Sequence, residues 1–150
     1  MSSFLSLNLA DLWTGRPAPA AVSAPVAVAA LLIELAECGA EPEEDRHDRI
    51  RAALVEIFGL GPWEVQGVLR EAEAAQWQSV DSYRFTHAIK TELDREQRWP
   101  ILRALARELE EGGTRTAVKT ATLARIAALL GFTQDEVVGE RLAVRDAHAH

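Results

Sequence analysis

The stretch that decides the fold is RAALVEIFGLGPWEVQG, residues 51–67. Its pattern recurs 72 residues later as LARIAALLGFTQDEVVG, residues 123–139. In both copies, apolar residues at helical spacing end at a glycine, an apolar residue follows, and a Glu-Val pair opens the next segment. A glycine just past the last apolar position commonly ends an α-helix in the left-handed conformation. The pattern therefore predicts two helix–stop–helix units with Gly59 and Gly131 at the stops.

The repeat extends toward the N-terminus of each unit. With one residue of slip, the apolar positions of the segment 28–36 match those of the segment 101–109. Each half then consists of an apolar helix, an acidic glycine turn, a helix, a glycine stop and a last helix. No segment alternates apolar and polar residues with the period of two typical of strands. The sequence predicts an all-α fold, a compact bundle of about seven helices with an internal pseudo-two-fold duplication.

Local signals refine this prediction. Asp94 and Gln97 have the spacing of a capping box, and so have Thr133 and Glu136. Pro100 lies six residues beyond Asp94 and is expected to kink or restart its helix, because proline lacks the N–H of an internal helical bond. We expect the tryptophans to pack in the core or at its rim, and a face of small residues to allow close helix contact. That small face consists of Ala117, Ala121, Ala124 and Ala128.

Length and composition limit the possible functions. The chain has 150 residues, of which 16 are Lys or Arg and 23 are Asp or Glu, for a formal charge of −7. A protein that binds nucleic acid or an anionic membrane surface needs a basic footprint, so we expect neither partner. The single cysteine, Cys38, cannot form an intrachain disulfide, which is consistent with a reducing compartment such as the cytoplasm.

The expected organisation is one helical domain with two short flanking segments. Residues 1–24 form an amphipathic turn followed by a Pro/Ala linker, residues 25–147 form the domain, and residues 148–150 form a frayed tail. No Lys or Arg precedes Arg16, so the positive region of a signal peptide is missing. Residues 1–24 can be a peripheral helix folded back onto the domain. Alternatively, they are an anchor for a partner or a membrane. This interpretation is less favoured, because the segment has no basic face.

The chain resembles the tellurite-resistance TerB-like domains over roughly residues 25–144. The resemblance rests on the turns Ala36-Glu37-Cys38-Gly39 and Leu109-Glu110-Glu111-Gly112, on the segment 80–86 before the second half, and on the Leu-Leu-Gly turn at residues 129–131. It implies an all-helical, internally duplicated, cytoplasmic protein without catalytic activity. It also implies a role around stress or tellurite resistance, and a carboxylate-bound metal as in some members.

A metal site is the one specific chemistry that the sequence suggests. Only the first acidic turn retains carboxylates downstream, because Thr114, Arg115 and Lys119 follow the second turn. A hard divalent cation needs several converging oxygen ligands, whereas a thiolate with an imidazole suits Zn²⁺. Alternatively, the acidic residues simply favour a helix N-terminus. The candidate metal ligands are Glu37, Cys38, Glu43, Glu44, Asp45 and His47.

The motifs of several enzyme classes are absent from the sequence. It contains no phosphate-binding glycine loop, no dinucleotide glycine pattern and no His-Glu-x-x-His pair. We therefore expect a non-enzymatic protein without a bound cofactor, which acts through contact with a protein partner of unidentified type. The alternative is a divalent-metal sensor that uses the acidic turn after the first helix. The oligomeric state does not follow from the sequence.

Overall fold

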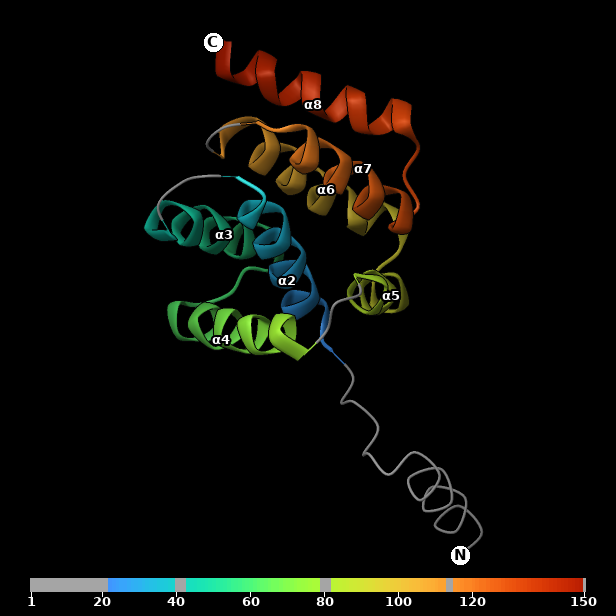
Figure 1. Ribbon diagram of the computed structural model, residues 1–150. Helices are drawn as coiled ribbons and strands as arrows, with labels where there is room; N and C mark the ends of the chain where they lie inside the picture. The colour runs from blue at the N-terminus through green and yellow to red at the C-terminus, as the bar shows by residue number, and fades with distance from the viewer. Residues whose placement is uncertain (1–21, 40–42, 79–81, 113–114, 150) are drawn as a thin grey trace, which may run out of the picture.

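A computed structural model describes residues 22–39, 43–78, 82–112 and 115–149 (Figure 1). These residues form seven α-helices and no strand, which confirms the predicted all-α bundle. The segments 1–21 and 150, with the predictions made for them, lie outside the described residues. The helices are α2 (Ala24–Glu37), α3 (Glu43–Phe58), α4 (Pro62–Gln78), α5 (Tyr83–Glu92), α6 (Arg95–Glu111), α7 (Ala117–Leu129) and α8 (Gln134–Ala149).

Helix α2 is the centre of the core. Eleven of its 14 residues are buried, as expected for a helix that is apolar on nearly all sides. It contacts α3, α4, α5, α6 and α7, so most other helices pack around it. The side chains that meet it include Ile50 and Leu54 from α3, Val65 from α4, and Ile101 from α6, all buried. The predicted core face of each of these helices is confirmed.

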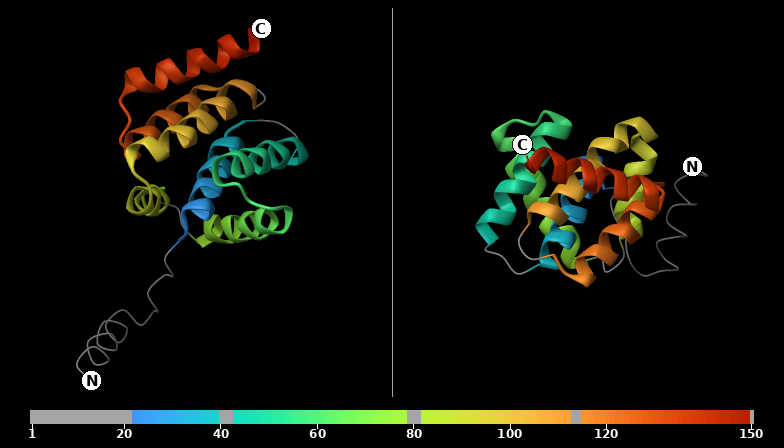
Figure 2. Two further views of the ribbon diagram at one scale, coloured as in Figure 1. Left: turned by 180° about the vertical axis from the view of Figure 1, so that it is seen from behind. Right: turned by 90° about the horizontal axis from the view of Figure 1, so that it is seen from above.

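The helices fall into two groups of three along the chain. In the first group α2 packs against α3 and α4, and in the second α6 packs against α7 and α8. Helices α4 and α8 lie at opposite ends of the molecule, with α2 and α6 between them (Figures 1 and 2). Gly59 and Gly131 both have positive φ values, 65° and 94°, as predicted for left-handed helix stops. The internal duplication itself stays a prediction.

The two predicted capping boxes are present. The Asp94 side chain accepts from the backbone N–H of Gln97, and the Gln97 side chain accepts from the backbone N–H of Asp94. Thr133 and Glu136 exchange the same two bonds at the start of α8. The restart expected at Pro100 as one of two outcomes is wrong, because α6 continues through it, and the other outcome, a kink, stays a prediction. Pro100 is exposed, so water can reach the backbone carbonyl that loses its internal bond there.

A buried ionic network joins three helices. Glu108 of α6 accepts two hydrogen bonds from the Arg49 guanidinium of α3, at 2.9 and 3.0 Å. The Lys119 ammonium of α7 lies 3.6 Å from the same carboxylate and donates to the carbonyl of Gly112. Only 3% of Glu108 and none of Lys119 is exposed. This network ties α3 of the first group to α6 and α7 of the second.

The outer face of α7 does not match its prediction. Ala117, Ala121, Ala124 and Ala128 are all exposed, so this small face makes no close helix contact within the described residues. The larger residues of α7, Leu123 and Ile126, face the core instead. Alanine suits such a position, because it has the highest helix propensity and needs no packing partner. No helix in the described ranges is long and apolar enough to cross a membrane.

Candidate functional site

The most unusual surface feature is a pair of exposed tryptophans on α4. Trp63 is 85% exposed and Trp77 is 91% exposed. At 100° per residue, a separation of 14 residues brings them within about 40° of each other around the helix and about 21 Å apart along it. They therefore share the outer face of α4. Tryptophan is a residue that proteins usually bury in large part, so this face is a strong candidate for a binding surface.

A pocket of about 240 Å³ lies beside Trp77, where the end of α2, the start of α3 and the end of α4 meet. Its apolar lining comes from residues of α2 and α3 that also belong to the core, so the floor of the pocket is well supported. Its remaining lining is charged and aromatic. The lining residues are Ile33, Ala36, Glu37, Arg46, His47, Ile50, Glu73 and Trp77.

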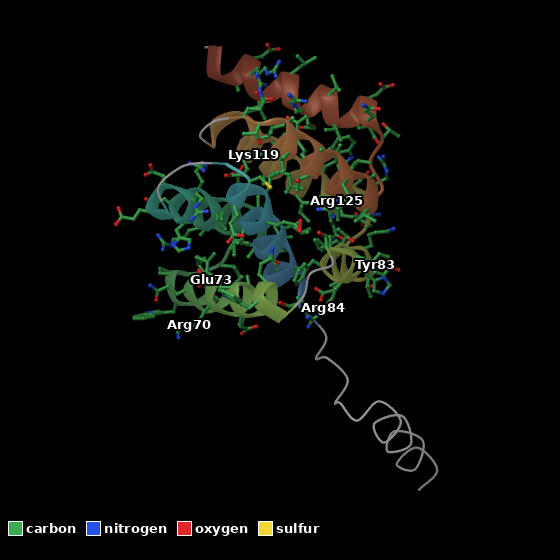
Figure 3. The ribbon with its side chains drawn as sticks, viewed as in Figure 1. Arg70, Glu73, Tyr83, Arg84, Lys119 and Arg125 are labelled. Carbon is green, nitrogen blue, oxygen red and sulfur yellow. The ribbon has the colours of Figure 1, made fainter. Side chains whose placement is uncertain are left out.

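One contact between side chains, that of His47 with Glu73, forms part of the wall of this pocket. The His47 imidazole Nε2 lies 3.1 Å from Oε1 of Glu73, which connects the first turns of α3 to the last turns of α4. Glu73 lies on the side of α4 that faces α3 (Figure 3). Both side chains are partly exposed, so a ligand in the pocket could reach them. The pair also ties α3 to the part of α4 that carries Trp77.

The structure brings together two of the predicted metal ligands and separates a third from them. Glu37 and His47 both line the pocket. Cys38 instead donates its thiol to the carbonyl of Glu34, at 3.4 Å, and its sulfur lies 3.6 Å from the hydroxyl of Thr122 on α7. The predicted pairing of Cys38 with His47 as a Zn²⁺ site gains no support from this placement.

The remaining predicted ligands lie at the start of α3. Glu44 and Asp45 are exposed, and the side chain of Glu43 lies outside the described residues. Among the described residues, no three His, Cys, Asp or Glu side chains gather closely enough to hold a metal ion. The described residues therefore do not fit the coordination that a hard divalent cation needs. The proposed metal site stays a prediction that requires a direct test.

The charge of the molecule is divided unevenly along the chain. Residues 22–78 carry four Arg and eleven Asp or Glu, a formal charge of −7. Residues 82–150 carry eleven Lys or Arg and ten Asp or Glu, a formal charge of +1. The whole net charge thus belongs to the half that contains the pocket and the exposed tryptophans. The segment that carries the pocket and the tryptophans is therefore acidic overall, and Arg70 is the cation that lies between Trp63 and Trp77 in the helical projection of α4.

Sequence reasoning missed the main residues of this site. The expectation that the tryptophans pack at the core or its rim is wrong for Trp63 and Trp77. It is right for Trp99, whose ring lies 4.9 Å from that of Phe132. The helical projection of α4 gave a signal. Trp63 and Trp77 lie about 120–160° around the helix from Val65, which belongs to the apolar stripe, so the projection places both away from the core. Glu73 had no such signal, since its partner is 26 residues away in the sequence.

The fold and the site together define an all-α helical module with an exposed aromatic face on α4 and a pocket beside it. A family model described as Tellurite resistance protein TerB matches residues 25–142. The match covers most of the chain, and the chain belongs to the TerB family. The resemblance seen in the acidic turns is thus confirmed. No curated protein and no solved structure shows a significant match to the chain.

Proposed function

We propose that this protein is a non-catalytic interaction module of the cytoplasm, which serves tellurite resistance or a related stress response by binding a protein partner. The observation that carries the proposal is the exposure of Trp63 and Trp77 on one face of α4. Binding energy at protein interfaces concentrates on a few residues, among which tryptophan is enriched. Family membership supports the link to tellurite resistance.

The charge around the site defines the chemistry of the partner. The pocket lining holds two carboxylates, Glu37 and Glu73, and one arginine, Arg46, and residues 22–78 as a whole carry eleven Asp or Glu against four Arg. The pocket itself has an apolar floor and room for one side chain of moderate size. The partner that fits is a segment with an aliphatic or aromatic residue for the pocket and Lys or Arg residues beside it. Complementary charge would speed the encounter and orient the segment.

A selection from a phage-displayed library of random 12-residue peptides tests this proposal. We expect selected peptides to combine Lys or Arg with Leu, Phe or Trp. The variants Trp63→Ala and Trp77→Ala should each weaken their binding by about tenfold or more, as loss of a central tryptophan does. Both residues are exposed, so neither variant should alter folding.

The matched control is Val118→Ala on α7, which also removes an exposed apolar side chain. It should leave peptide binding unchanged. Peptides that are acidic, or that bind the Trp63→Ala/Trp77→Ala double variant as tightly as the natural chain, would contradict the proposal. Glu37→Lys separates the contribution of charge from that of packing. It should weaken the binding of basic peptides and change the binding of uncharged apolar peptides less.

A further inference from the structure

Three arginines converge on one carboxylate at the end of the molecule that carries α8. Glu110, near the end of α6, is only 7% exposed at its side chain. Its Oε1 accepts from Nε of Arg141, and its Oε2 accepts from Nε of Arg145 and from a terminal nitrogen of Arg115. All three distances are 2.9 Å. The three guanidinium groups come from α8 and from the segment that leads into α7.

The charge of this cluster is not balanced. One carboxylate faces three guanidinium groups, which leaves two positive charges in a protein whose formal charge is −7. Burial raises the pKa of Glu110, but hydrogen bonds from Arg145 and Arg141 outweigh it and hold the pKa below its ordinary value. Glu110 therefore remains ionised at neutral pH, and its charge cannot increase further. A second anion at this cluster would neutralise the excess positive charge.

The arginines also keep most of their hydrogen-bonding capacity. A guanidinium has five N–H donors, and each of these three uses one of them on Glu110. None of the three makes another hydrogen bond or ion pair within the described part of the chain. Arg115 and Arg145 are close to half exposed, so their remaining donors face solvent. Glu110 already holds these three guanidinium groups in place. A ligand that binds them therefore costs less side-chain rotamer entropy than it would with freely moving arginines.

We propose that Arg115, Arg141 and Arg145, held together by Glu110, form a binding site for a phosphate group. Guanidinium groups bind phosphate oxygens with strong, charge-assisted hydrogen bonds in planar, paired geometry. A phosphate dianion would also neutralise the two excess charges. The ligand can be free phosphate or a phosphorylated side chain of a protein partner, because both present the same oxygens. The site is separate from the tryptophan face of α4 and does not depend on the function proposed for that face.

The test uses the full chain, labelled with ¹⁵N, in a chloride buffer of constant ionic strength. Inorganic phosphate is added while the Nε–H signals of arginine are followed by NMR. Saturable shifts are expected for Arg141 and Arg145, whose Nε–H groups contact Glu110. Arg145→Gln should weaken phosphate binding by about tenfold, the effect of one charged hydrogen bond. The matched control Arg107→Gln removes an arginine of similar exposure on α6 and should leave the affinity unchanged.

Glu110→Gln distinguishes a binding site from a structural ion cluster. Glutamine keeps the side-chain length and one oxygen that accepts from the guanidinium groups, so the arginines stay grouped. The change removes the competing carboxylate charge and leaves three positive charges, so phosphate should bind about fivefold tighter or more. In a purely structural cluster, the same change lowers stability and produces no phosphate effect. The proposal fails if phosphate causes no saturable shift in the natural chain and none in Glu110→Gln. It also fails if Arg107→Gln weakens phosphate binding as much as Arg145→Gln does.

A phosphoserine peptide and its unphosphorylated twin distinguish the source of the phosphate. If the phosphopeptide binds at least ten times more tightly than inorganic phosphate and the unphosphorylated peptide does not bind, the site recognises a phosphorylated protein partner. If the phosphopeptide and inorganic phosphate bind equally, the site takes free phosphate. Either result supports the site itself.

Discussion

Replacement of Glu108 by alanine should destabilise the fold more than any surface change. The carboxylate accepts both hydrogen bonds from Arg49 and lies 3.6 Å from the ammonium of Lys119, which has no exposed surface. Its removal leaves a fully buried ammonium with the carbonyl of Gly112 as its remaining partner. Removal of one partner from a buried ion pair costs about 3–5 kcal/mol. For a chain of this length, that loss lowers Tm by about 6–20 °C.

The assay is urea unfolding at pH 7 of the natural chain, Glu108→Ala, Lys119→Met and the double variant. Lys119→Met should cost less, because Glu108 keeps both bonds to Arg49. The double variant should be more stable than the sum of the single losses predicts, by about 1 kcal/mol or more, since it no longer contains the buried ammonium that Glu108→Ala leaves without a counter-ion. If Glu108→Ala unfolds within 1 kcal/mol of the natural chain, the reasoning on the network is refuted.

Three further predictions concern the core, one carboxylate and the metal. Leu54→Ala and Ile126→Ala should each lower the free energy of unfolding by about 2–5 kcal/mol in urea titrations, because both residues are fully buried. An unchanged midpoint would show that the core face is misassigned. Two hydrogen bonds lower the pKa of Glu136 from 4.5 to about 2: first the one that the Arg95 side chain donates, then the one that the Thr133 backbone N–H donates. Its contribution to stability should therefore be complete above pH 4.5 and disappear as the pH falls to 2, so Glu136→Gln should destabilise at pH 7 and not at pH 2. Millimolar Ca²⁺ or Mg²⁺ should leave Tm unchanged, whereas a rise of several degrees that Glu44→Gln abolishes would establish the metal site.

The sequence predicts much of this fold because its signals are local. Gly59 and Gly131 end their helices in the left-handed conformation, and the capping box at Asp94 forms as its spacing predicts. Such features depend on neighbours within four residues. Pro100 shows the limit of the same reasoning, because an exposed helix turn tolerates a proline that the local rule treats as a break.

The sites are harder to predict because they depend on tertiary packing. His47 meets Glu73 only because α3 packs against α4, and Lys119 is buried only because the Glu108 carboxylate balances its charge and the Gly112 carbonyl accepts its hydrogen bond. The cluster around Glu110 joins residues up to 35 positions apart. A helical projection of α4 is an intermediate case, since the outward direction of Trp77 follows from its angle to the buried stripe.

The measurement that tests the central claim most directly is an NMR titration of the tryptophan indole N–H signals. The natural chain is titrated with a basic, apolar peptide from the phage selection, and single Trp→Phe variants assign each signal. If α4 is the binding face, the signals of Trp63 and Trp77 shift with the same saturation curve, while that of Trp99, packed against Phe132, stays in place. Saturation of the peptide without a shift of Trp63 or Trp77 would contradict the account.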